Sequence, residues 1–205
     1  PPPPLHNTIE LTHERLLAVL EKFSEMLLRP RTLRLTVHGG ACMLLHPELY
    51  ALSQQMPLGH GQAVPTMAAG THLRDLPRRT ATRDVDFIMR GFVADYAGLA
   101  QMDAASRLKA CIRSTARLHF PGLGADWMNA DPDQALPMGA DPVTHATFDP
   151  LHSSAQSEEN RRKFTVFRSK NRRLELVSVP PYWSVALKLV RWGKQDWGDV
   201  GVLLR

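Results

Sequence analysis

Two aspartates that lie two residues apart, Asp84 and Asp86, are the residues whose types and spacing most directly indicate chemistry in this chain. Side chains of a strand alternate between its two faces, so both carboxylates are expected on one face. Carboxylates held side by side repel each other, and a divalent cation such as Mg²⁺ relieves that repulsion. The alternative is a strand without a metal, in which the aspartates face solvent while Val85, Phe87 and Met89 are buried.

A glycine pair upstream favours the metal site. Residues 33–38 predict a strand, Gly39 and Gly40 predict a tight turn, and residues 41–45 predict the start of a helix. A strand, a glycine turn and a helix N-terminus expose backbone N–H groups where no side chain blocks a phosphate. The two segments together predict a place for a triphosphate beside a place for its metal ions.

This combination resembles the nucleotidyltransferase superfamily, which has the DNA polymerase beta-like fold. Its signature is a hydrophobic residue with Gly-Gly or Gly-Ser, followed by a strand that carries Asp-hydrophobic-Asp. Residues 79–86 (Arg-Thr-Ala-Thr-Arg-Asp-Val-Asp) are similar to the lead-in of its AbiEii-toxin-like and minimal nucleotidyltransferase branch. Residues 126–129 with 136–137, and residues 186–189 with Arg191, Asp196 and Asp199, are also similar to that branch, so the resemblance covers most of residues 33–205.

The resemblance implies a Mg²⁺-dependent enzyme that transfers a nucleoside monophosphate from a nucleoside triphosphate to an acceptor. The acceptor would be a protein, an RNA or a small molecule. Two Mg²⁺ ions are expected, with Mn²⁺ as an alternative, held by Asp84, Asp86 and a third carboxylate. Glu175 is the candidate for that third ligand or for a base on the acceptor side, and the alternative is a solvent-facing strand glutamate.

The resemblance also implies a set of nucleotide-binding residues. They are Gly39, Gly40, Arg79, Thr82, Lys188 and Arg191. Lys188 would neutralise the triphosphate, and its alternative is an ordinary surface lysine on a helix over residues 181–192. Asp196 and Asp199 are expected in the first turn of a last helix, or paired with Arg191 or Arg79.

One departure from the superfamily concerns the distance between the glycines and the aspartates. An insertion at about residues 46–79, rich in Pro, Gly, Gln, Met and His, lies between them. Its weak periodicity predicts a loop or lid, which would close over a nucleotide, occlude the site, or do neither.

Length and composition set the remaining expectations. The 205 residues predict an N-terminal tail and helix over 1–30 and a nucleotidyltransferase-like domain over 31–205. The net charge of +5 suits phosphate-bearing ligands, but no Arg-rich run indicates nucleic acid. Two cysteines without metal-ligand spacing predict reduced thiols in an intracellular, cytoplasmic protein, and no apolar run is long enough to predict a membrane partner.

The expected fold is α/β in the α+β sense, a short mixed β-sheet flanked by helices. Helices are predicted over residues 8–28, from residue 91 through 118, and near the C-terminus, with a hairpin of strands at 164–167 and 174–179. Residues 122–157 are expected to be rich in loops, with Trp127 in the core. The alternative function is a catalytically inactive protein of the same fold that acts as a nucleotide-binding or interaction module, and a third is a transferase acting on tRNA ends.

Overall fold

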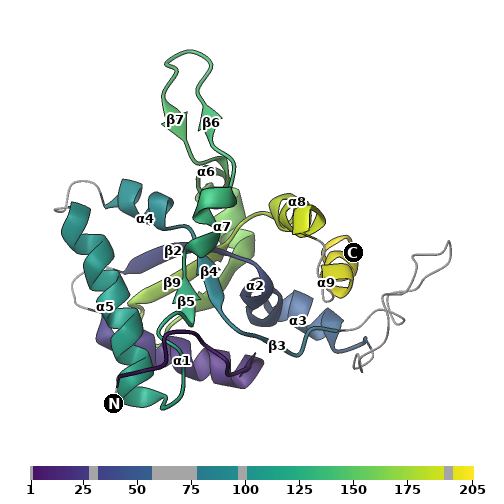
Figure 1. The fold of residues 1–205 in the computed structure, drawn as a ribbon. Helices are drawn as coiled ribbons and strands as arrows, with labels where there is room; N and C mark the ends of the chain where they lie inside the picture. The colour runs from purple at the N-terminus through teal and green to yellow at the C-terminus, as the bar shows by residue number, and fades with distance from the viewer. Residues whose placement is uncertain (1, 28–31, 57–77, 97–100, 192–195) are drawn as a thin grey trace.

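The computed structural model describes residues 2–27, 32–56, 78–96, 101–191 and 196–205, with only the backbone at 101–103 and 191. Within these ranges the structure is an α/β fold with a mixed main sheet and flanking helices, as the sequence predicts (Figure 1). The elements are β1 (Leu11–Thr12), α1 (His13–Met26), β2 (Leu33–His38), α2 (Gly40–Leu45), α3 (Pro47–Ser53), β3 (Ala81–Thr82), β4 (Val85–Phe87), α4 (Met89–Asp95), α5 (Gln101–His119), β5 (Met128–Asn129), the 3₁₀ helix η2 (Asp131–Ala135), β6 (Gly139–Ala140), β7 (Thr147–Phe148), α6 (Pro150–Ala155), α7 (Glu158–Phe164), β8 (Thr165–Arg168), β9 (Leu174–Ser178), α8 (Pro181–Arg191) and α9 (Asp196–Leu203).

The main sheet has the strand order β5-β4-β2-β9-β8. Strand β2 pairs parallel with β9 and antiparallel with β4, and β4 pairs parallel with β5. Register pairs His38 with Asp86, and Asp86 in turn with Asn129. These three residues therefore share one face of the sheet at one level, because directly paired residues point the same way.

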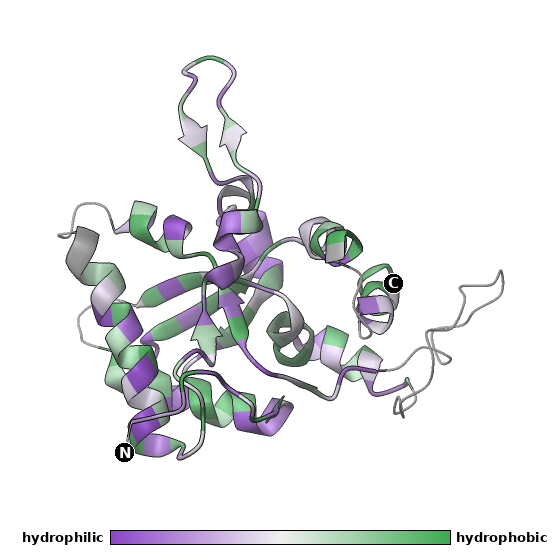
Figure 2. Ribbon diagram, in the orientation of Figure 1, coloured by the Kyte–Doolittle hydropathy of each residue, from purple (hydrophilic) through white to green (hydrophobic). Residues whose placement is uncertain are grey.

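The opposite face of the sheet carries the main hydrophobic core. Leu35, Val37, Phe87 and Leu176 point to that face and are buried against α1 and α5. Helix α1 begins at an N-cap, where the Thr12 hydroxyl accepts a hydrogen bond from the Arg15 amide. Figure 2 shows hydrophobic colour over α2, whose six residues are all buried. The sheet thus has one apolar face and one face that carries polar groups.

The N-terminal residues belong to the same core and sheet system as the rest of the chain. Strand β1 pairs antiparallel with β3, and α1 packs against α5. The Ala125 amide donates a hydrogen bond of 2.7 Å to the Pro4 carbonyl, and the backbone of Asn7 lies against Gly124. The predicted N-terminal tail is therefore fixed on the segment that leads into β5.

Two other segments contain more regular structure than their sequences predict. Helix α3 occupies the start of the expected loop or lid at 46–79, because Pro47 stands at its first turn and the His46 side chain accepts from the Leu49 amide. Residues 57–77 of the insertion lie outside the described part of the chain. The stretch at 122–157, expected to be loop-rich, forms a projecting β6–β7 hairpin and α6 (Figure 1).

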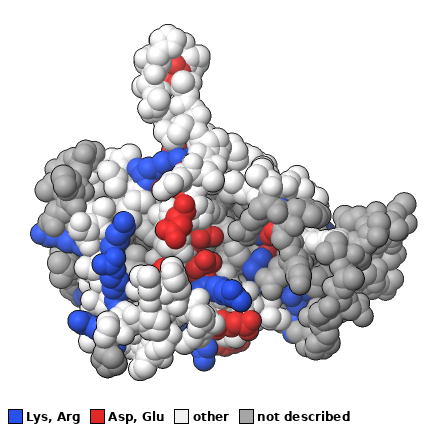
Figure 3. Space-filling view, viewed as in Figure 1, with Lys and Arg blue, Asp and Glu red and all other residues white. Residues whose placement is uncertain are grey.

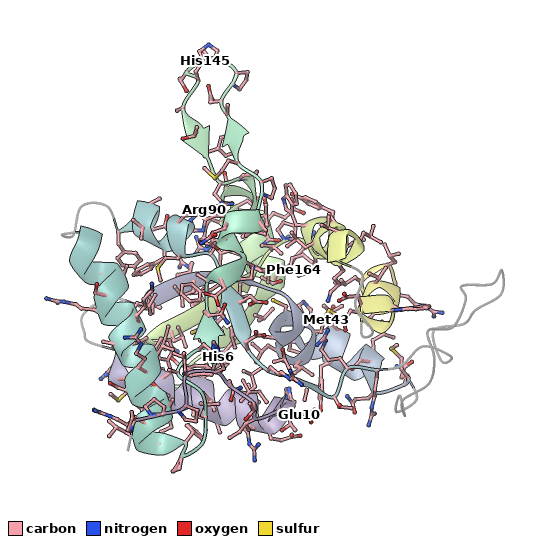
Figure 4. All side chains as sticks on the ribbon, viewed as in Figure 1. His6, Glu10, Met43, Arg90, His145 and Phe164 are labelled. Atoms are coloured by element: carbon pink, nitrogen blue, oxygen red, sulfur yellow. The ribbon has the colours of Figure 1, made fainter. Side chains whose placement is uncertain are left out.

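Arg90 fixes the base of that hairpin. Its guanidinium donates to the carbonyls of Asp133, Leu136 and Pro137 and pairs with the Asp149 carboxylate. Figure 4 shows Arg90 at the foot of the hairpin and His145 at its tip. No helix in the described ranges combines the length and the apolar character that crossing a bilayer requires.

Candidate active site

Asp84 and Asp86 line one cavity of about 630 Å³ at the polar face of the sheet. Asp86 lies in β4 and is only 8 % exposed, while Asp84 immediately precedes the strand and is half-buried. The structure therefore brings the two predicted carboxylates to one place, although only one of them is inside the strand. The lining residues are Glu10, Gly40, Arg79, Ala81, Thr82, Arg83, Asp84, Asp86, Asp126, Asn129, Asp131, Pro132 and Asp196.

The glycine turn lies directly against the predicted carboxylate and guanidinium groups. Gly39 has φ +78° and ψ −156°, a conformation that is essentially confined to glycine. A Cβ atom on Gly39 would lie 2.6 Å from the Asp86 Oδ2 atom. A Cβ atom on Gly40 would lie 2.6 Å from Arg79 Nη1 and 3.0 Å from Thr82 Oγ1. Both glycines are therefore required sterically.

Arg79 is held in place by a buried aspartate from the last helix. Its Nε donates to both carboxylate oxygens of Asp199, at 3.1 and 2.9 Å, and its Nη2 donates to Oδ2 at 2.6 Å. The Arg79 side chain is 9 % exposed and that of Asp199 is 2 % exposed. Asp199 thus lies in the first turn of α9 and also pairs with Arg79, one of the two arginines given as its alternative partners. The pairing leaves the Nη1 edge of the guanidinium facing the glycine turn.

Lys188 is in a different position from the one expected of a triphosphate ligand. Its ammonium group is buried between Asp199 Oδ2 at 2.6 Å and Asp196 Oδ1 at 3.4 Å, and it does not line the cavity. The surface-lysine alternative is also wrong, since the side chain is 3 % exposed. Lys188 therefore neutralises Asp199, which holds Arg79, and also contacts Asp196. The side chain of Arg191 lies outside the described residues.

Glu175 is not part of the cavity, which corrects its expected role as the third metal ligand. It pairs in register with Arg34, four positions before His38 on β2, and so lies about 13 Å along the sheet from the level of Asp86. Its oxygens contact Arg34 Nη2 at 3.4 Å and Arg168 Nη2 at 3.5 Å. Alternation along the strand places Glu175 on the predicted face, but the register places it at the far end of that face.

Several cavity residues had no assigned role in the sequence. Asn129 pairs with Asp86 across β4 and β5, and Asp126 and Asp131 lie at either side of it. Asp126 is held by the Asn7 amide at 2.6 Å and by His6 Nδ1 at 2.9 Å, and Figure 4 shows His6 beside β5. The Asp-Trp-Met-Asn segment at residues 126–129 was the feature of the sequence that could have identified these cavity residues, because it is similar to a segment of the nucleotidyltransferase superfamily. Trp127 within it is fully buried, as predicted, and donates to the Ile112 carbonyl.

Cys42, which follows the glycine turn, does not supply a nucleophile at neutral pH. Burial raises the pKa of its thiol to about 12, and the nearby Asp86 carboxylate acts in the same direction. A thiolate is the reactive form of cysteine, so Cys42 acts as a small apolar residue beneath the turn.

The donor set fits one hard divalent cation better than two. Mg²⁺ is commonly bound by one or two carboxylates together with phosphate and water oxygens, and Asp84 and Asp86 can supply those carboxylates. Within the described ranges, no group of three or more His, Cys, Asp or Glu side chains is arranged to hold a metal. Acids outnumber bases around the cavity, which favours a cation together with an anionic ligand (Figure 3).

Comparisons of the chain with known protein families, with curated proteins and with solved structures found no match.

Proposed function

We propose that this protein is a Mg²⁺-dependent nucleotidyltransferase that transfers a nucleoside monophosphate from a nucleoside triphosphate to an acceptor hydroxyl. The observation that supports it best is the packing of the Gly39–Gly40 turn between the Asp86 carboxylate and the Arg79 guanidinium. A buried aspartate fixes that guanidinium, so a cation of the protein and a pair of carboxylates face the same cavity in defined positions.

In this reaction the protein does not need to form a covalent bond with the substrate. A bond forms between the acceptor oxygen and the α-phosphorus, the bond to the β-phosphate breaks, pyrophosphate leaves, and the hydroxyl proton passes to solvent. Catalysis of this kind depends on positioning and on neutralising charge at the phosphoryl oxygens. Asp84 and Asp86 would hold Mg²⁺, which supplies part of that neutralisation when bound. Arg79 would bind a phosphate oxygen through the guanidinium edge that Asp199 leaves available.

The test is transfer of label from α-³²P nucleoside triphosphates in the presence of Mg²⁺. Each of the four triphosphates would be incubated with the protein alone, with total RNA, and with a protein extract. The Asp84→Asn/Asp86→Asn variant is expected to lose transfer and keep its fold. A Glu158→Gln/Glu159→Gln variant is the matched control, because it removes two exposed carboxylates on α7, away from the cavity. Equal transfer by both variants would contradict the proposal.

A catalytically inactive nucleotide-binding module is the second candidate, and the position of Glu175 favours it. With Glu175 neutralised by Arg34 and Arg168, the site has lost the third carboxylate that two-metal catalysis was expected to use. Mg²⁺-dependent thermal stabilisation by a triphosphate, without transfer to any acceptor, would support this candidate, because binding to the folded state raises its stability. Absence of any stabilisation would argue against both candidates.

A further inference from the structure

The β6–β7 hairpin projects away from the body of the protein. We refer to residues 137–148 as the arm, and Figures 1 and 3 show that it stands clear of the helices and of the main sheet. All of its residues except Gly139 and Asp141 are exposed. A two-stranded hairpin on its own is at best marginally stable in water, because neither of its faces is packed. A partner that covers the arm would therefore add to its stability.

The composition of the arm suits a protein partner. Met138 and Phe148 at its base are 53 % and 42 % exposed, and Val143 at its tip is 84 % exposed. Asp141 is its single charged residue among Lys, Arg, Asp and Glu. Exposed apolar side chains with little charge are typical of protein–protein contacts, whereas a polyanion such as nucleic acid requires cations.

The tip of the arm has a defined shape before any partner binds. Asp141 Oδ1 accepts hydrogen bonds from the amides of Val143 and Thr144, at 2.9 and 2.6 Å, and from the Thr144 hydroxyl at 2.9 Å. The His145 amide donates to the Asp141 carbonyl, and His145 has a φ of 57°. A contact made by such a tip loses little conformational entropy on binding.

A groove of about 540 Å³ lies at the base of the arm, between the arm, α4 and α6. Met138 and Phe148 form an apolar part of its wall, and Asp95 and His152 form a polar part. His152 is fixed by Thr36 Oγ1, 2.8 Å from its Nδ1 atom, and by Asp95 Oδ1, 3.2 Å from its Nε2 atom. The Asp95 side chain remains 42 % exposed. The groove therefore suits an apolar side chain with a hydrogen-bond donor or a cation beside it.

The tip of the same arm is too far away to fill this groove. Val143 follows Met138 by five residues, which is about 16 Å of extended chain, and the antiparallel register of β6 and β7 holds the two apart. A second copy of the chain carries the same tip. When two arms lie antiparallel about a two-fold axis, the tip of each lies at the base of the other. Val143 then meets Met138 and Phe148, and the His145 imidazole lies near the Asp95 carboxylate, which favours its protonated form.

We propose that this chain forms a symmetric dimer in which the two arms pack against each other and the tip of each arm occupies the groove of the other copy. The 12 residues of the arm and the nine further residues that line the groove approach the roughly 20–30 residues per partner of a stable interface. The arm does not line the cavity of the carboxylate pair, so the dimer is independent of the proposed transferase activity.

A lipid surface fits the arm less well than a second copy does. Its apolar side chains lie at opposite ends, with Met138 and Phe148 at the base and Val143 at the tip. Asp141 and His145 lie beside Val143, so an inserted tip would bring polar groups into the bilayer.

Sedimentation velocity of the whole chain, over about 1–100 μM, measures the dimer directly. Val143→Asp is the test variant, and Val190→Asp is the matched control, because Val190 on α8 is 88 % exposed. The wild type and the control are expected to show the same dissociation constant. Val143→Asp is expected to raise it at least about tenfold, since each dimer would bury the new carboxylate twice in an apolar wall. Circular dichroism verifies the fold of each variant.

The exchanged arrangement is tested by cross-linking two single-cysteine variants, His145→Cys and Asp95→Cys, in a Cys111→Ser background with a short bismaleimide. A cross-linked dimer is expected when the two variants are mixed, and much less of it when either variant is alone. A monomer at every concentration would overturn the proposal, and so would equal weakening by Val143→Asp and Val190→Asp. A dimer in which the mixed pair cross-links no better than either variant alone would equally overturn it.

Discussion

Asp86 and Glu175 lie on the same face of the same sheet, yet their surroundings differ completely. Asp86 lines an acidic cavity and lies against a glycine turn whose missing side chains make room for it. Glu175 is equally buried, but Arg34 and Arg168 neutralise it at the other end of β2 and β9. A carboxylate that a neighbouring cation already neutralises has little attraction for a metal, so position along the strand decides its role.

The largest effect expected from this comparison is on transfer. Asp86→Asn should lower the transfer rate at least about a thousandfold, because it removes a ligand of the Mg²⁺ that would neutralise the phosphoryl oxygens, whereas Glu175→Gln should leave the rate within a few-fold. Initial rates with labelled triphosphate at saturating Mg²⁺ measure both. If Glu175→Gln is as inactive as Asp86→Asn, the two carboxylates are not functionally distinct and the assignment of the cavity is wrong.

The next effect concerns the buried ions behind the cavity. Lys188→Met should lower the free energy of unfolding by about 3–5 kcal/mol, because it removes the buried cation that contacts both Asp196 and Asp199. Urea denaturation measures the change. Lys22→Met is the control, since the Lys22–Glu25 pair is exposed and its loss should have little effect. A similar loss of unfolding free energy in both variants would show that the buried ion pairs contribute no more to stability than the exposed pair does.

A smaller effect is expected at the glycine turn. Gly39→Ala should lower stability by about 1–3 kcal/mol for its backbone conformation alone, and should also weaken Mg²⁺-dependent triphosphate binding by displacing Asp86. Gly122→Ala shares the positive φ, at +91°, but among the described residues its Cβ would approach only the Ile9 side chain, at 3.3 Å. The control should therefore lose stability and keep binding. Thermal unfolding with and without Mg²⁺ and triphosphate separates the two effects, and unchanged binding in Gly39→Ala would argue against the contact with Asp86.

The effect that is smallest at neutral pH is a dependence of stability on alkaline pH. The folded Cys42 thiol keeps its proton to a pKa of about 12, above its ordinary value of 9.0. Its contribution to stability is therefore complete below pH 9 and is lost as the pH rises from 9 toward 12, by up to about 1.4 kcal/mol per pH unit. Cys42→Ala should flatten this part of the curve in urea denaturation more than Cys111→Ala does. An equal slope in all three proteins would contradict the burial of Cys42.

Local patterns predicted the elements that position the candidate site. Residues 33–38 form β2 as expected from their alternation, and the Gly-Gly pair forms the turn because only glycine accepts its backbone angles and its close neighbours. Trp127 is in the core. These predictions depend on contacts within a segment or on strong local preferences, which sequence patterns record well.

Register and long-range pairing were not predictable from those patterns. The same alternation is compatible with Glu175 at any level of β9, and only its pairing with Arg34 fixes the level. The helical periodicity of residues 181–191 indicated a helix but not that Lys188 would face two aspartates from the following helix. The β6–β7 hairpin was not predicted, because its strands are only two residues long. In addition, its base is held by Arg90, which is far away in sequence.

The ion pair between Arg79 and Asp199 joins residues 120 positions apart, and this separation affects the order in which the protein can become functional. During synthesis the sheet strands and both predicted metal ligands leave the ribosome before α9 does. Arg79 has no buried partner on that helix until the helix is made, so the cavity can acquire its fixed guanidinium only after α9 has left the ribosome. A nascent chain, or a chain cleaved before residue 196, would carry the carboxylate pair in a sheet without an ordered Arg79.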